Sequence, residues 1–109
     1  MLLPLSVTLR AASVLLIADQ VPTLNVEPFC RTVAKRATPV ADVETCLEGE
    51  RKARDELARE WSQFTAADKS HCLQLSSLGG DPTYTELLTC LELQRDARRL
   101  RAQDRDKPD

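Results

Sequence analysis

Four cysteines constrain the fold of this 109-residue chain more than any other feature. They are Cys30, Cys46, Cys72 and Cys90, separated in turn by 15, 25 and 17 residues. No pair has the Cys-x-x-Cys spacing of thioredoxin-like redox sites or of c-type haem attachment, and the spacings are unlike those of zinc ligands. In a small exported chain, four cysteines predict two disulfides. The alternative, four buried free thiols, would suit a cytosolic protein.

The N-terminal residues predict export. A short apolar block at residues 11–18 follows the single positive charge of Arg10 and precedes the polar residues Asp19 and Gln20. This order is typical of a secretory signal peptide, so the mature chain is expected to begin near Asp19, in the periplasm or outside the cell. A retained N-terminal anchor and an ordinary N-terminus are the alternatives. A spanning helix needs roughly 20 apolar residues, so no stable membrane span is expected after signal cleavage.

The composition favours helices and disfavours nucleic-acid binding. Only three glycines occur, and aromatic residues make up 4% of the chain, so the core is expected to consist mainly of Leu, Val and Ala. The net charge is −2, and removal of residues 1–18 takes away only Arg10, which gives −3. A chain without a basic excess has no general attraction for nucleic acid.

The chain is expected to contain one small domain. The predicted organisation is a signal peptide at 1–18, an extended lead-in at 19–37, a helical domain at 38–101 and a disordered tail at 102–109. The lead-in is predicted to be extended because Pro22 and Pro28 lack backbone donors and restrict their neighbours. At most one helical turn is expected in it, from Cys30 to Ala37. The tail is expected to be frayed because its sequence is strongly polar.

The first helix of the domain is predicted over residues 40–61, with Thr38 as its N-cap and Pro39 as its first residue. Its apolar stripe, continued into the next turn, consists of Val43, Cys46, Ala53, Leu57, Trp61 and Phe64. Glu50 falls inside this stripe. Glu50 is either a buried carboxylate that binds a ligand or metal, or the partner of Arg54 at a partly wet edge, and the second interpretation is favoured.

Two further helices are predicted to form an antiparallel hairpin. The second helix is predicted over residues 66–78. Thr65 and Asp68 form its N-terminal capping pair, and Gly79-Gly80 supplies the left-handed stop at its C-terminal end. The third helix is predicted over residues 82–100, with Asp81 as its N-cap and Pro82 as its first residue. Thr83 with Glu86 offers a second capping pair. The predicted fold is therefore an all-α, disulfide-stapled three-helix domain.

The hairpin selects one of the three cysteine pairings. Cys72 and Cys90 lie at nearly the same height on either side of its turn, since a helix rises about 1.5 Å per residue. The same geometry displaces Cys46 from Cys72 by about 12 Å, whereas a disulfide needs Cα atoms within about 7 Å. Cys30, on the lead-in, can fold back to Cys46. The predicted pairs are Cys30–Cys46 and Cys72–Cys90.

About half of the chain, residues 43–93, carries a set of motifs that occur together in a known family. They are Thr45-Cys46-Leu47-Glu48, Ala53-Arg54, Leu57, Trp61-Ser62-Gln63-Phe64, Cys72, and Tyr84-Thr85-Glu86-Leu87-Leu88-Thr89-Cys90-Leu91-Glu92. In these residues the chain resembles a family of small, uncharacterised, exported proteins of alphaproteobacteria, the rhizobia and their relatives. The resemblance implies an exported helical protein with the cysteines as its framework, and it implies no activity.

The residues that usually carry catalysis are scarce, so no enzyme and no cofactor are predicted. The one histidine, His71, adjoins Cys72, but neighbours on a helix point in different directions. No phosphate-binding Gly-rich loop, Gly-x-Ser-x-Gly or His-Glu-x-x-His motif occurs in the sequence.

Three classes of function are compatible with this pattern. The favoured one is a non-catalytic periplasmic module that binds a protein or envelope component. Its candidate interaction surface is Trp61, Phe64, Arg95, Arg98 and Arg99. The favoured interpretation of these residues is nevertheless structural: the aromatics, with Trp61 largely buried, are expected in the core, and the arginines at a solvated helix end. The second is a metal-binding or thiol-redox protein that uses the cysteines and Glu50. The third, an enzyme, would need a pocket that the composition does not indicate.

Overall fold

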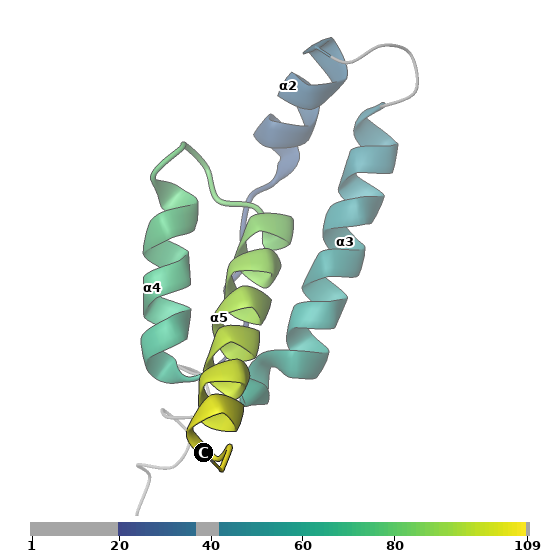
Figure 1. Ribbon diagram of the computed structural model, residues 1–109. Helices are drawn as coiled ribbons and strands as arrows, with labels where there is room; N and C mark the ends of the chain where they lie inside the picture. Colours follow the sequence, from purple (N-terminus) through teal and green to yellow (C-terminus); the bar gives the residue numbers. More distant parts are fainter. Residues whose placement is uncertain (1–19, 37–41, 109) are drawn as a thin grey trace, which may run out of the picture.

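The computed structural model describes residues 20–36 and 42–108, and the predicted signal peptide lies outside these residues. In these ranges the chain forms four helices and one short 3-10 turn, and it forms no strand (Figure 1). The elements are α2 (Glu27–Arg36), α3 (Val43–Glu60), η1 (Trp61–Gln63), α4 (Ala66–Ser77) and α5 (Tyr84–Arg105). The all-α prediction is confirmed, and the structure corrects the predicted count of three helices by adding α2.

Helix α2 lies where the extended lead-in was expected. Pro28 occupies its first turn, in which a backbone N–H has no helical acceptor, so the proline removes no hydrogen bond. The Cys30 N–H donates to the Val26 carbonyl at 3.0 Å, and Glu27 pairs with Arg31 at 2.5 Å along one face. The prediction of an extended chain is therefore wrong for Glu27–Arg36.

Helix α3 begins one residue after Asp42, whose carboxylate accepts a hydrogen bond from the Thr45 N–H at 2.7 Å. This bond lowers the pKa of Asp42, because it favours the ionised carboxylate. The N-cap predicted at Thr38 and the first residue predicted at Pro39 lie outside the described residues. At its other end α3 tightens into η1, which turns the chain toward α4.

The caps of α4 follow the predicted pattern, and those of α5 follow it in part. Thr65 accepts a hydrogen bond from the Asp68 N–H at 3.1 Å, and Gly80 has a φ of 127°, which other residues rarely adopt. Thr83, rather than Asp81, caps α5 by accepting from the Glu86 N–H at 3.1 Å. The helix also continues to Arg105, so the tail predicted to be disordered from residue 102 is helical over its first four residues.

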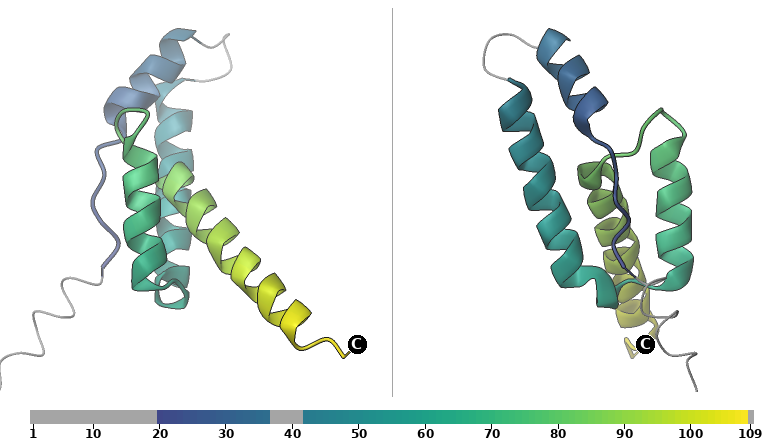
Figure 2. Two further views of the ribbon diagram at one scale, coloured as in Figure 1. Left: turned by 60° about the vertical axis from the view of Figure 1, so that its left-hand side comes forward. Right: turned by 180° about the vertical axis from the view of Figure 1, so that it is seen from behind.

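The four helices form two hairpins, each closed by one disulfide. Cys30–Cys46 joins α2 to α3 with a Cα–Cα distance of 5.5 Å, and Cys72–Cys90 joins α4 to α5 at 5.6 Å. Both predicted pairs are confirmed. In each hairpin the two helices run in opposite directions, and α5 crosses the body obliquely so that its C-terminal part stands away from the other helices (Figure 2).

The core lies where α3 and α5 meet. Its buried members are Ala53, Leu57, Trp61, Phe64, Cys72, Tyr84, Leu87 and Leu91. The segment before α2 covers one side of this core with Val21, Leu24 and Val26, and the Leu24 N–H donates to the Tyr84 hydroxyl at 2.8 Å. Within the described ranges, no helix combines the length and apolar character needed to cross a membrane.

Candidate interaction surface

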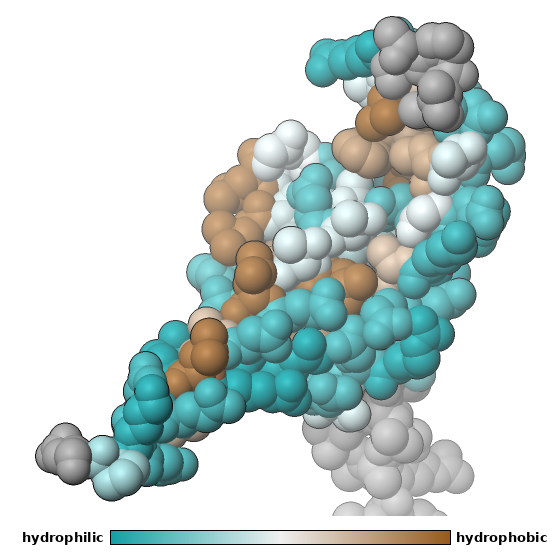
Figure 3. Space-filling view, turned by 45° about the vertical axis from the view of Figure 1, so that its right-hand side comes forward, coloured by the Kyte–Doolittle hydropathy of each residue, from teal (hydrophilic) through white to brown (hydrophobic). Residues whose placement is uncertain are grey.

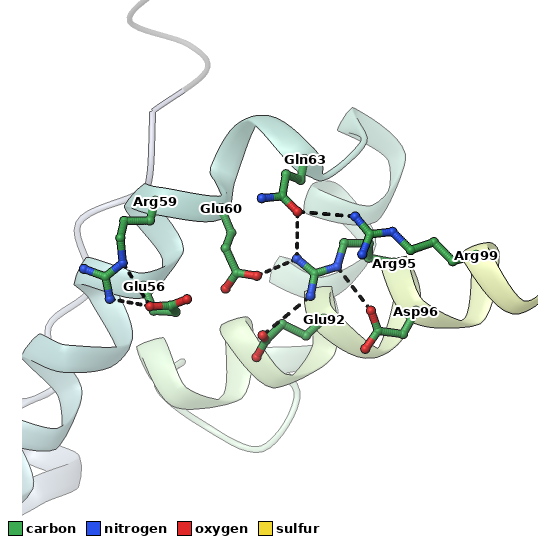
Figure 4. Close-up of polar contacts among 8 residues, drawn as sticks. All are labelled: Glu56, Arg59, Glu60, Gln63, Glu92, Arg95, Asp96 and Arg99. Carbon is green, nitrogen blue, oxygen red and sulfur yellow. Dashed lines mark hydrogen bonds and ion pairs between the residues drawn. The ribbon is translucent and has the colours of Figure 1, made fainter.

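Arg95 is the centre of a polar cluster between the end of α3 and the middle of α5 (Figure 4). Its Nη1 donates to Glu60 Oε1 at 2.5 Å and to Gln63 Oε1 at 3.1 Å. The guanidinium also lies over the Phe64 ring, 5.4 Å from its centroid, which is a cation–π distance. Because the Arg95 side chain is only 12% exposed, it acts as a bridge within the fold rather than as a free cation.

The cluster contains more acid than one guanidinium neutralises. The hydrogen bond to Glu60 raises the pKa of Arg95. Burial raises the pKa of Glu92, and the charge of Glu60 adds to that rise, while the Arg95 guanidinium 3.7 Å away opposes it. Glu92 is therefore harder to ionise in the folded protein than in an unfolded chain.

The predicted interaction surface of aromatics and arginines is mostly internal. Trp61 is 8% exposed and Phe64 is also buried, with their rings edge to face at a centroid distance of 6.5 Å. Arg98 forms an ion pair with Asp68 of α4. Arg99 is exposed and makes one long contact, 3.4 Å, with Gln63. The structure therefore supports the interpretation of Trp61 and Phe64 as core residues over their assignment to an interaction surface, and it leaves Arg99 on the surface.

Glu50 is buried, and its carboxylate is bonded within the fold rather than paired with Arg54 as favoured from the sequence. Its side chain is 4% exposed and holds the first turn of α5. Glu50 Oε2 accepts from the Tyr84 N–H at 2.8 Å and the Thr85 N–H at 3.4 Å, and Oε1 accepts from the Thr85 hydroxyl at 2.7 Å. A carboxylate at this end of a helix is favoured both by the unpaired N–H groups and by the helix dipole. Glu50 thus joins the two hairpins, and Arg54 is not its partner.

The cysteines also have structural roles. All four are paired in disulfides, and Cys30 and Cys72 are completely buried. Among the residues that the structure describes, no three or more His, Cys, Asp or Glu side chains are grouped closely enough to hold a metal ion. Disulfides persist mainly in oxidising compartments, so this pairing indicates an environment outside the reducing cytosol.

Several large apolar side chains remain on the surface. They are Phe29, Leu75, Leu78, Leu93 and Leu100. Phe29 belongs to α2, while Leu75 and Leu78 lie at the C-terminal end of α4, and Leu78 is 80% exposed. Figure 3 shows apolar side chains at the surface between hydrophilic areas. Single exposed leucines are common on proteins, so a hollow beside such residues is the more informative feature.

A hollow of about 270 Å³ separates α2 from the end of α4, and we call it the α2–α4 hollow. Its lining residues are Pro28, Phe29, Thr32, Ser76, Gly79, Asp81 and Glu86. A second hollow of about 470 Å³ is lined by Phe29, Thr32, Val33 and Arg36. Phe29 and Thr32 therefore line both hollows, and Leu75 and Leu78 lie at the end of α4.

Sequence reasoning missed the α2–α4 hollow. The sequence predicts an extended segment at Phe29 and helix caps at Asp81 and Glu86. A helical reading of Glu27–Arg36, which the first-turn proline permits, would have placed Phe29 and Thr32 on the same face of a helix.

Comparisons of the chain with protein-family models, with curated proteins and with solved structures find no match. The inferences below therefore depend on the geometry of the chain itself.

Proposed function

We propose that this protein is an exported, non-catalytic binding module that works in the periplasm or outside the cell and engages a protein or envelope component. The observation that carries the proposal is the exposure of three large apolar side chains on the two disulfide-fixed short helices: Phe29, which lines the α2–α4 hollow, and Leu75 and Leu78 at the end of α4. Both α2 and α4 are fixed by a disulfide to a longer helix, so they can present these side chains at little cost in ordering entropy.

Two further observations support a binding role. The most buried ionisable side chain, Glu50, and the central arginine of the cluster, Arg95, are both bonded within the fold. The two disulfides suit the oxidising compartment to which a signal peptide at residues 1–18 would deliver the chain. Membership in the family of small exported alphaproteobacterial proteins, which residues 43–93 resemble, is part of the same proposal.

A pull-down from envelope extract tests the proposal. The tagged, oxidised protein is compared with a double variant carrying Phe29→Ser and Leu78→Ser, and with a control carrying Leu93→Ser and Leu100→Ser on α5. We expect one species to be captured by the wild type and the control, and to be lost with the first variant. Equal capture by both variants would contradict the assignment of this surface. Circular dichroism of each variant establishes that the fold is retained.

A further inference from the structure

The segment before α2 lies over the core as a strap. We call residues 20–26 the strap, and seen from behind they run as an extended chain between α3 and α4 (Figure 2). Leu24 and Val26 are half-buried against the core, whereas Thr23 and Asn25 are exposed. This alternation is that of an extended chain lying on an apolar surface. The strap contains no charged residue, so apolar contacts are its main attachment.

The strap is fixed at one end and held weakly along its length. Shortly after its end, the disulfide between Cys30 and Cys46 fixes the chain to α3. By contrast, one hydrogen bond within the described ranges joins the strap to the helices that it covers, from the Leu24 N–H to the Tyr84 hydroxyl at 2.8 Å. Segments with few contacts and few hydrogen bonds open at a low cost in free energy. The strap can therefore leave the core while α2 stays in place.

The strap also leaves space beside it. A hollow of about 400 Å³ is lined by residues 20–23 of the strap and by Ala58 and Trp61. A second hollow of about 180 Å³ is lined by the later part of the strap and by Leu47 and Tyr84. We call the surface under the strap, formed by α3, η1 and Tyr84, the strap groove. Atoms that face a gap lose part of their dispersion contacts, so a chain that follows α3 more closely would pack better in this groove.

Trp61 identifies a contact that the strap does not make. Its side chain is 8% exposed and lines the larger hollow, and its indole Nε1 is buried without a hydrogen-bond partner among the described residues. The strap lines the same hollow and supplies no acceptor to this donor. The disulfide at Cys30 limits how far the strap can slide along the groove. A chain without this tether is free to bring a carbonyl to the indole, a donor that proteins usually pair when it is buried.

From these observations we infer that the strap groove binds an extended segment of a protein partner, which replaces the strap. The strap itself shows the chemistry of that segment, which is uncharged, extended and apolar at alternating positions. The Tyr84 hydroxyl accepts from a backbone N–H of the bound chain, as it does from Leu24, and the Trp61 indole donates to a backbone carbonyl. This groove is a second binding surface, separate from the exposed apolar side chains of α2 and α4, and it goes beyond the proposed function.

Nuclear magnetic resonance titration of the oxidised full chain tests the inference, with an acetylated and amidated peptide of residues 20–26 as the probe. The tethered strap competes at an effective concentration of about 1 mM, so weakening it should strengthen binding of the peptide. We expect Leu24→Ser to bind the peptide about tenfold more tightly than the wild type, since partial burial of one leucine is worth roughly one decade in an equilibrium constant. Trp61 is the only tryptophan, so its indole N–H gives one resolved signal, which should move downfield as the hydrogen bond forms.

Matched variants and a matched peptide serve as controls. Val21→Ser, a second change in the strap, should act in the same direction as Leu24→Ser. Leu93→Ser, the same substitution at an exposed leucine of α5, should bind the peptide like the wild type. A control peptide with serine in place of its leucine and both valines should not bind. Equal affinity of the wild type and Leu24→Ser, equal binding of the control peptide, or an indole signal that stays in place at saturation would overturn the inference.

Sedimentation of the protein distinguishes a partner from a second copy. We expect the wild type to be monomeric at concentrations at which the peptide binds. A wild-type dimer that Leu24→Ser abolishes would assign the groove to the strap of a second copy and would overturn the assignment to a partner. None of these outcomes depends on Phe29, Leu75 or Leu78, so the proposed function is tested separately by the pull-down.

Discussion

Replacing Glu50 with alanine tests the polar contact that joins the two disulfide-closed hairpins. The carboxylate lies on α3, in the first hairpin, and it accepts from the Tyr84 N–H and the Thr85 hydroxyl of α5, in the second. These groups are 34 and 35 residues away in sequence, so the contacts join the two hairpins and not neighbouring turns of one helix. The Thr83 hydroxyl is already used by the Glu86 N–H.

The expected cost follows from the bonds removed. A hydrogen bond to a charged group contributes about 1.5–3 kcal/mol net, and the bond to Tyr84 N is buried, so it should fall within that range. The contacts with Thr85 are partly exposed and should add about 0.5–1 kcal/mol. We therefore expect Glu50→Ala to lower the free energy of unfolding by about 2–4 kcal/mol, a large part of the total for a small domain.

Urea unfolding of the oxidised protein, followed by Trp61 fluorescence, measures this change. The slope of the free energy against urea should stay the same, because the area exposed on unfolding is unaltered. Glu48→Ala is the matched control: Glu48 lies on the exposed side of α3 and pairs only with Lys52, at 3.7 Å, so less than about 0.5 kcal/mol is expected. A Glu50→Ala protein as stable as the control would refute the role assigned to this carboxylate.

Three other outcomes are expected. Trp61→Ala should cost about 3–5 kcal/mol, and the wild-type emission should be that of a buried indole; emission typical of a hydrated indole would contradict this. Replacing Cys72 and Cys90 with alanine should lower the free energy of unfolding by about 3 kcal/mol in the chain-entropy model, and unchanged stability would count against a structural disulfide. The pKa of Glu92 is raised in the fold, so its contribution to stability is present in acid and declines as the pH rises through that pKa. Glu92→Gln should therefore gain on the wild type between about pH 3 and pH 7 in thermal melts, whereas a constant difference would contradict the shift.

Local rules predicted a large part of this fold. The cap at Thr65, the stop at Gly79-Gly80 and the equal heights of Cys72 and Cys90 all follow from nearby sequence and helix geometry. Helix α2 is not predicted, because Pro22 and Pro28 favour an extended chain, although a proline in the first turn of a helix has no hydrogen bond to lose.

The contacts between the hairpins are harder to predict because they join residues that are distant in sequence. The Glu50 carboxylate accepts a hydrogen bond from the Tyr84 N–H, 34 residues away, and no local pattern in α3 indicates this acceptor. The sequence favours a solvated helix end at Arg95, yet this side chain is bonded to Glu60 at the end of α3 and to Gln63 of η1. The α2–α4 hollow arises only when the two hairpins pack together.

One tryptic digest of the protein isolated from its host, alkylated but not reduced, tests both the disulfide framework and export. No Lys or Arg occurs between Ser70 and Gln94, so Cys72 and Cys90 share the peptide 70–95, which should be lighter than its reduced form by two hydrogens. Cys30 should link a peptide that ends at Arg31 to the peptide 37–51. The first of these should begin near Asp19 if the signal peptide is removed, and at residue 11, after Arg10, if it is not. A link between peptides 37–51 and 70–95, or alkylated cysteines with a chain that still carries residues 11–18, would contradict an exported protein built from two disulfide-closed hairpins.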